Sequence, residues 1–300
     1  MNTLARARFE QPQFDQLEVE FDYENAAYWL RMNPFPRPCF NEDLLVEIRR
    51  FIDGLRGTIP QPAGYVVLAS QIPGIFNLGG DLEVFREAIK RRDAARLRHY
   101  ARLCVDDLYP WHCNFDLPVT TISLVQGDAL GGGLEAALAS TYVIAEESAR
   151  LGFPEVLFNL FPGMGAYSFL RKKVGRRIAD RLITSGNLYS AQQLFDLGVV
   201  DAVAPDGEGE EAVSRFIRQH SRSANGRRAY EQVCRDIDAL TREELEAVAE
   251  IWVQAALRLT ERDLRMMERL VRAQHNRSAM PDYRPTRFAG GAQLEAVANI

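Results

Sequence analysis

The sequence predicts an α/β fold, and three observations support this class. Short apolar stretches that are typical of buried strands alternate with amphipathic stretches that are typical of helices. Two of the strands are each followed by a glycine-rich loop and a helix, which resembles a structural repeat. From Glu210 to about His275 the pattern is helical. We therefore expect an α/β domain over residues 1–205, a helical C-terminal region over 206–275 and an extended tail over 276–300.

Strands are expected where apolar residues alternate with polar ones or form a short run. Leu17–Asp22 alternates, and Ala26–Met32 would be its hairpin partner. Helices are expected from Asn41, a residue type that favours the N-cap position, and from Asp81 to Cys113. The remaining strands are expected at residues 65–69, 121–125, 142–145 and 199–204.

Composition and charge exclude several classes of protein. A net charge of −5 over 300 residues gives no sign of nucleic-acid binding. No apolar run reaches the roughly 18 residues of a membrane span, and the first residues lack the apolar core of a secretion signal. The four cysteines have no metal-type spacing, so we expect reduced thiols in a cytoplasmic protein and no metal or other cofactor.

The triple glycine in Gly131-Gly132-Gly133-Leu134-Glu135 is the most informative motif. It follows an apolar strand and opens a helix, so its backbone N–H groups are approachable and lie where negative charge is favoured. Such a turn can stabilise an oxyanion on main-chain donors, with a carboxyl group close by. The alternatives are that the glycines serve only a tight turn and that Glu135 is an ordinary helix-start residue.

Two further motifs complete a possible site. Gly79-Gly80-Asp81 lies between a strand and a helix, and Asp81 is expected to cap that helix. Gly152-Phe153-Pro154-Glu155 is followed by the glycine-rich turn at 161–165. Two glycine loops after neighbouring strands can place two N–H groups around one oxygen, and two carboxyl groups can then flank the adjacent carbon.

These motifs, in this order and spacing, resemble the crotonase (enoyl-CoA hydratase/isomerase) superfamily over residues 15–220. The resemblance implies a crotonase-like spiral of repeated ββα units with a helical C-terminal trimerisation region, hence a homotrimer or a dimer of trimers. It also implies that Gly80 and Gly132 form the oxyanion hole and that Glu135 and Glu155 are catalytic. We assign Glu155 as the base at the α-carbon and Glu135 as the acid at the β-hydroxyl.

Other features resemble one subgroup, the diffusible-signal-factor synthases. These features are the bulky segment Ala166–Leu170, the long stretch Cys104–Asp116 and the extended C-terminal region. The subgroup implies dehydration of a 3-hydroxyacyl chain on acyl carrier protein and then thioester cleavage to a cis-2-unsaturated fatty acid signal. It also implies a possible cognate sensor protein. The alternatives are an enoyl-CoA hydratase/isomerase that acts on acyl-CoA, and a non-catalytic crotonase fold that serves as a regulatory partner.

The apolar C-terminal residues and the basic runs have two interpretations each. Apolar residues at helical spacing between Ile251 and Leu270 either pack in the core or between subunits, or line an acyl-chain pocket. The runs Arg171–Lys173 and Arg176–Arg177 are either solvated surface or a dock for an acidic carrier. The residues expected to contact substrate are Gly79, Gly131, Met164, Trp252 and Leu270.

Overall fold

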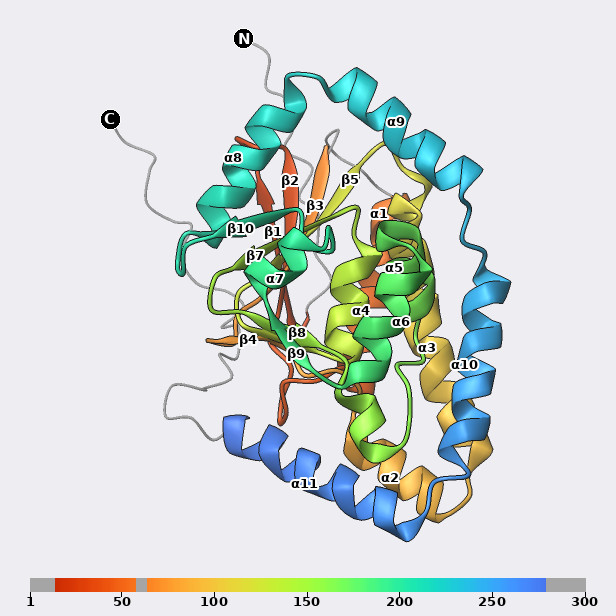
Figure 1. The fold of residues 1–300 in the computed structure, drawn as a ribbon. Coiled ribbons are helices and arrows are strands. Elements are labelled where there is room, and N and C mark those ends of the chain that lie inside the picture. The colour runs from red at the N-terminus through yellow and green to blue at the C-terminus, as the bar shows by residue number, and fades with distance from the viewer. Residues whose placement is uncertain (1–13, 58–63, 279–300) are drawn as a thin grey trace.

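The computed structural model describes residues 14–57 and 64–278, which form two β-sheets and a set of flanking helices (Figure 1). The main sheet has the strand order β1-β2-β3-β5-β7-β10, and the second sheet has the order β4-β6-β8-β9. The main sheet consists of β1 (Leu17–Asp22), β2 (Ala27–Met32), β3 (Tyr65–Ser70), β5 (Thr120–Val125), β7 (Tyr142–Glu146) and β10 (Ala202–Ala204). The second sheet consists of β4 (Ile75–Asn77), β6 (Asp128–Leu130), β8 (Arg150–Gly152) and β9 (Leu188–Ser190).

The strand pairs β3–β4, β5–β6 and β7–β8 each contribute one strand to the main sheet and one to the second sheet. Strands β3, β5 and β7 are neighbours in the main sheet and pair in parallel, and β4, β6 and β8 do the same in the second sheet. A helix follows the first two of these strand pairs. The predicted spiral of ββα units is therefore confirmed. The sequence did not reveal the second sheet, because its three-residue strands are too short to show an alternating pattern.

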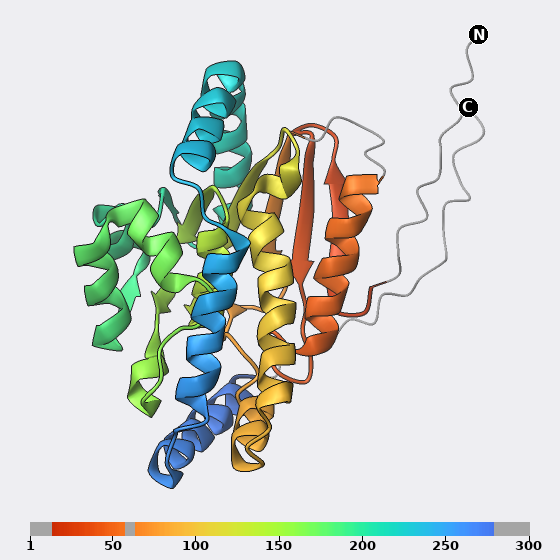
Figure 2. The same cartoon turned by 90° about the vertical axis from the view of Figure 1, so that its right-hand side faces the viewer.

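Helices pack against both faces of the main sheet. Helices α1, α3 and α10 run side by side, as the view in Figure 2 shows, and α11 crosses the lower end against α2. Their bounds are α1 (Glu42–Gly57), α2 (Leu82–Lys90), α3 (Ala94–His112), α4 (Gly132–Ala139), α5 (Ala166–Val174), α6 (Arg176–Ser185), α7 (Ala191–Asp196), α8 (Gly209–Ser221), α9 (Ala224–Ile237), α10 (Arg242–Ala256) and α11 (Glu261–Ser278). Two 3₁₀ helices, η1 (Asn114–Asp116) and η2 (Pro154–Phe158), complete the described chain.

The caps follow the rules that the sequence indicated. The Asn41 side chain accepts a hydrogen bond from the backbone N–H of Leu44 (2.9 Å) at the start of α1. Asp81 caps α2 and also forms a buried ion pair with Arg37 (2.7 Å). A capping side chain pairs with the otherwise unbonded N–H groups of the first helical turn. Both predicted N-caps are therefore confirmed.

Two predictions need adjustment at their edges. The strand expected over residues 199–204 begins only at Ala202. The expected helical C-terminal region is present, but α11 continues to Ser278, three residues beyond the predicted end of that region. The rest of that tail, residues 279–300, lies outside the described residues. Within the described part of the chain, no helix is long and apolar enough to cross a membrane, and no His, Cys, Asp and Glu cluster could hold a metal ion.

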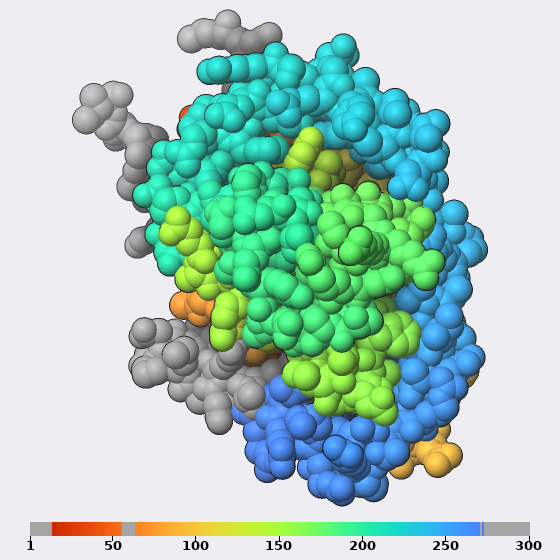
Figure 3. All heavy atoms as spheres, in the orientation of Figure 1, coloured from red at the N-terminus to blue at the C-terminus, as the bar shows by residue number. Residues whose placement is uncertain are grey.

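A buried polar cluster joins the main sheet to helices α8 and α9, which cover the top of the molecule in Figure 3. One carboxylate oxygen of Glu231 lies 2.9 Å from His220 Nε2 and accepts a hydrogen bond from the Tyr142 hydroxyl (3.2 Å), and the other accepts one from Thr120 (2.9 Å). His220 Nδ1 lies 3.0 Å from the Tyr65 hydroxyl. Both carboxylate oxygens and both imidazole nitrogens therefore have partners.

Candidate active site

Two glycine loops meet where the second sheet ends. The loop after β4 and the loop after β6 contact each other closely, because a Cβ on Gly79 would lie 2.7 Å from the Leu130 carbonyl oxygen and 3.0 Å from the Gly132 nitrogen. Gly79 also has a φ of +92°, which side chains rarely adopt. The parallel pairing of β4 with β6 brings the two loops together. Glycine is therefore required where one backbone packs against the other.

The two predicted oxyanion donors lie side by side at this contact. A Cβ on Gly132 would lie 3.4 Å from the Gly80 nitrogen. Gly132 is the first residue of α4, so its N–H has no acceptor within the helix. Among the described residues, neither the Gly80 N–H nor the Gly132 N–H donates a main-chain hydrogen bond. Two neighbouring N–H groups of this kind can bind a developing oxyanion.

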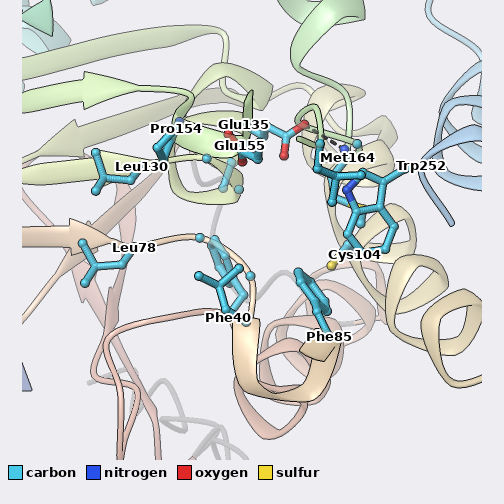
Figure 4. Close-up of a pocket in the computed structure, with 18 of the residues that line it drawn as sticks. Phe40, Leu78, Phe85, Cys104, Leu130, Glu135, Pro154, Glu155, Met164 and Trp252 are labelled. Atoms are coloured by element: carbon cyan, nitrogen blue, oxygen red, sulfur yellow. Dashed lines mark hydrogen bonds between the residues drawn. The ribbon is translucent and has the colours of Figure 1, made fainter. Parts of the chain in front are cut away.

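Glu135 is held by backbone amides deep in the molecule. It lies on α4 and is 1% exposed. Its Oε1 atom accepts hydrogen bonds from the backbone N–H groups of Met164 (2.7 Å), in the glycine-rich turn, and of Ala166 (2.9 Å), the first residue of α5. Figure 4 shows this carboxyl group directed toward Met164. The turn that the sequence singled out therefore orients one of the two predicted acids.

Glu155, in η2, lies against the triple glycine. It directly follows Pro154, and a Cβ on Gly131 would overlap its Oε1 atom. Its Oε2 atom is buried and has no hydrogen-bond partner among the described residues. Figure 4 places Glu155 beside Glu135. The fold thus brings the two predicted acids together, and glycine at 131 leaves the space that one of them occupies.

The environment keeps both acids from ionising at their usual pH. Burial raises the pKa of Glu135 to about 7, although hydrogen bonds from Ala166, Met164 and Gly165 oppose the shift. Burial and then the charge of Glu135 raise the pKa of Glu155 to about 8. The pair therefore carries about one proton between the two groups near neutral pH. One acid and one base side by side are what proton transfer at two adjacent carbons requires.

A cavity of about 290 Å³ lies in front of these groups, and all nine predicted site residues line it. Trp252 on α10 and Leu270 on α11 contribute to the wall, so the C-terminal helices reach the site. The Trp252 ring packs against Phe85, with centroids 4.9 Å apart (Figure 4). Of the apolar C-terminal residues, however, Ile251 and Met266 are 56% and 36% exposed. The predicted apolar face is therefore divided between a cavity wall and the surface.

Sequence reasoning missed the contribution of α3 to the cavity. One face of this helix supplies lining residues at helical spacing, which are Tyr100, Cys104, Asp107, Leu108 and Trp111. Phe40 and Phe85 line the same space (Figure 4). The helical spacing on α3 was visible in the sequence, but any core-facing helix shows the same pattern. Only the tertiary structure shows that this face of α3 lines the cavity.

Four of the five residues in the basic runs form ion pairs within the described part of the chain. Lys173 forms an ion pair with Asp201 (2.7 Å), and Lys172 pairs with Asp238 (2.9 Å). Their side chains are only 18% and 11% exposed. Arg176 is exposed and pairs with Asp180 at 3.4 Å. The two lysines are therefore committed to the fold, which weakens the interpretation of this run as a carrier dock.

Comparisons with known proteins agree with this geometry. The profile of the family described as enoyl-CoA hydratase/isomerase matches residues 33–271. The chain belongs to this family of enzymes.

Individual relatives match only part of this chain. The fatty acid oxidation complex subunit alpha of Pseudomonas savastanoi pv. phaseolicola is 34% identical over 192 residues, which are 63% of this chain and 24% of that protein. Mouse mitochondrial methylglutaconyl-CoA hydratase is 28% identical over 60% of this chain and 55% of its own length. The chain thus spans about a quarter of the first relative and about half of the second. The structure of Pseudomonas aeruginosa DspI has a TM-score of 0.67 and 26% identity, and the match covers 79% of this chain and 93% of that one.

Proposed function

We propose that the protein dehydrates a 3-hydroxyacyl thioester and then hydrolyses the thioester, which releases a cis-2-unsaturated fatty acid of the diffusible-signal-factor type. One observation carries the proposal: two buried carboxyl groups lie together in an apolar cavity, beside two backbone N–H groups that donate no main-chain hydrogen bond among the described residues. The apolar walls fit an acyl chain. The substrate would be carried by acyl carrier protein, with acyl-CoA as the alternative carrier.

The oxyanion hole would make the first step feasible. Removal of an α-proton from a thioester places negative charge on the carbonyl oxygen, and the N–H groups of Gly80 and Gly132 are positioned to stabilise it. One such donor contributes roughly 3–4 kcal/mol to transition-state stability in known enzymes. The second acid then donates a proton as the β-carbon–oxygen bond breaks, and water leaves. In the second step an activated water attacks the same carbonyl, and the thiol departs with a proton.

The roles of the two acids are open to a direct test. The predicted roles make Glu155 the base and Glu135 the acid. Both pKa values are raised, so the two acids share their proton near neutral pH and either one could be the base.

Proton exchange separates these assignments. A saturated acyl-CoA has no β-hydroxyl, so its exchange of the α-proton in D₂O needs only the base and the oxyanion hole. With the predicted roles, Glu155→Gln abolishes this exchange and Glu135→Gln retains most of it, as proton NMR would show. The opposite pattern would assign the base to Glu135.

Products test the function itself. Wild-type protein is expected to release a free cis-2-enoic acid from a 3-hydroxyacyl carrier, as mass spectrometry would detect. Either Glu→Gln variant should lower the rate by about 10²–10⁴-fold, which is the usual contribution of a general acid or base. Dehydration without release of a free acid would remove the thioesterase step from the proposal. Turnover at the wild-type rate in both variants would refute the site.

A second candidate is a hydratase or isomerase of fatty-acid metabolism. The names of the relatives from Pseudomonas savastanoi and mouse favour it, because both refer to fatty-acid or acyl-CoA chemistry. Reversible hydration of trans-2-enoyl-CoA, with no free acid, would support this candidate. The bulky segment Ala166–Leu170, which opens α5 beside Glu135, supports the signal-synthase assignment instead.

We also propose that the C-terminal helices pack between subunits of a homotrimer or a dimer of trimers. Exposed apolar side chains on α9 and α10 support this proposal, and they are Tyr230, Val233, Ile237 and Ile251. Sedimentation at micromolar concentration tests it, and a monomeric mass would contradict it. A cognate sensor protein remains a prediction from the resemblance to signal synthases.

A further inference from the structure

Asp107 is a buried carboxyl group that the proposed mechanism does not use. It lies on α3 and is 6% exposed, and neither of its carboxyl oxygens has a hydrogen-bond partner among the described residues. Folded proteins rarely leave such a group unpaired, because its lost hydration is not replaced. The one other buried glutamate or aspartate with an unpaired oxygen in the cavity wall is Glu155, among the described residues. A ligand in the cavity could therefore form the hydrogen bonds that Asp107 lacks.

Burial of Asp107 disfavours its charged form. Burial raises the pKa of Asp107 well above its usual range, and Asp106 and Asp53 raise it further. The nearby Arg49 charge opposes this shift only in part, because its guanidinium is engaged elsewhere: it donates to the Asp106 carbonyl oxygen (2.6 Å) and pairs with Asp53 (3.2 Å). A protonated carboxyl group has one O–H donor and one carbonyl acceptor. In its protonated form, Asp107 would present a donor and an acceptor side by side.

The position of Asp107 relates it to the acyl chain. It lines the same cavity as the two glutamates. Tyr100, on the same helix, has its hydroxyl 3.6 Å from the place of a Cβ on Gly80, so this end of α3 lies at the oxyanion hole. Asp107 is two helical turns further along, roughly 10 Å along the axis. It therefore lies in the same cavity but away from the predicted oxyanion hole.

Apolar residues dominate the wall of the cavity that Asp107 lines. They include Leu108 and Trp111 from α3, and Leu45 and Ile48 from α1. A plain hydrocarbon chain would fill this region without pairing the carboxyl group, which would remain desolvated. A hydroxyl on the chain can accept from and donate to a neutral carboxyl group without bringing a charge into the apolar wall.

We propose that Asp107 selects acyl chains that carry a hydroxyl group several carbons beyond the β-carbon. This inference rests on the proposed function in one respect, namely that the cavity binds an acyl thioester. It makes Asp107 a specificity-determining residue for the distal part of the chain. It assigns no role to Asp107 in the reaction at the thioester.

Binding of unreactive ligands tests the inference without turnover. Acyl-CoA thioethers of one chain length, plain or with a hydroxyl at successive positions from the δ-carbon outward, would be titrated by calorimetry. Wild-type protein is expected to bind one hydroxylated isomer about ten- to a hundredfold more tightly than the plain chain, since a site that holds an unpaired polar group rejects an apolar ligand. Asp107→Leu should abolish that preference or reverse it toward the plain chain. Asp107→Asn should keep part of it.

Controls separate selection from a general loss of structure. Asp106 is the adjacent residue and pairs with Arg242 outside the cavity, so Asp106→Asn should keep the wild-type preference. Asp107→Ala repeats the test if Asp107→Leu does not fold. No preference for any hydroxylated isomer in the wild type, or an unchanged preference in both apolar variants, would overturn the inference. A preference that depends on Asp107 in a protein that dehydrates no thioester would instead count against the proposed function alone.

Discussion

Two buried acidic clusters in this molecule show how differently a fold can treat a carboxyl group. Glu231, between the main sheet and α8–α9, has partners for both oxygens in Thr120, Tyr142 and His220. Glu155, at the cavity, has a buried oxygen with no described partner and lies against its like-charged neighbour Glu135. Full pairing fixes the position of an acid and stabilises the fold. Incomplete pairing leaves an acid able to gain and lose a proton, which chemistry requires.

The largest expected effect is on stability at high pH. Because the pKa of Glu155 is raised to about 8, its protonation stabilises the folded state fully below the ordinary value of 4.5, and this contribution is lost as pH rises through about 8. Glu155→Gln removes the ionisation. We expect the variant to gain on the order of 3 kcal/mol over wild type between pH 5 and pH 9, as measured by urea unfolding. A difference between the two proteins that does not change with pH would contradict the raised pKa.

The next effect comes from the space beside the triple glycine. In Gly131→Ala the new Cβ would overlap the Glu155 carboxyl group and force it to move. We expect a tenfold to hundredfold fall in kcat, since a displacement of about 1 Å in an active site can cost this much. Gly175→Ala is the matched control, because Gly175 also has a positive φ (+76°) but no atom within 4 Å of its Cβ position. Equal losses of activity in both variants would show that backbone strain, not the position of Glu155, is responsible.

The smallest effect concerns the fully paired cluster. Glu231→Gln keeps the shape of the side chain but changes its hydrogen-bonding groups, so the free energy of unfolding should fall by about 1–2 kcal/mol. Glu231 does not line the cavity. We therefore expect kcat and KM of the variant to stay within about twofold of wild type at a temperature where both proteins are folded. Thermal unfolding and steady-state kinetics on the same preparation check both statements. A large loss of kcat with unchanged stability would place this cluster in the mechanism.

The sequence was sufficient where local rules dominate. The apolar runs gave the long strands of the main sheet, and Asn41 and Asp81 are confirmed as helix caps because capping depends on adjacent residues. The spacing of the glycine motifs gave the residues that the fold gathers around the cavity. Their catalytic roles remain predictions, because proximity alone does not show proton transfer.

Long-range packing determined what the sequence did not reveal. The strands β4, β6 and β8 are defined by their pairing with one another, not by a pattern of their own. Asp107 is one of two adjacent acids on α3, and only the tertiary structure shows that it lines the cavity. Ile251 and Met266, at the same spacing as their buried neighbours, are exposed in the single chain. The sequence gives the order of residues along a helix, and the tertiary structure decides what each side contacts.

The meeting of Gly80 and Gly132 has a consequence for the order of events as the chain folds. The two amides belong to successive turns of the spiral and become neighbours only after β4 has aligned with β6. Contacts between distant segments form late and slowly. A newly made or refolding chain can therefore hold much of its helical content before the Gly80 and Gly132 amides are neighbours. Recovery of turnover should lag behind recovery of helical circular dichroism, and the delay would time the closure of the spiral.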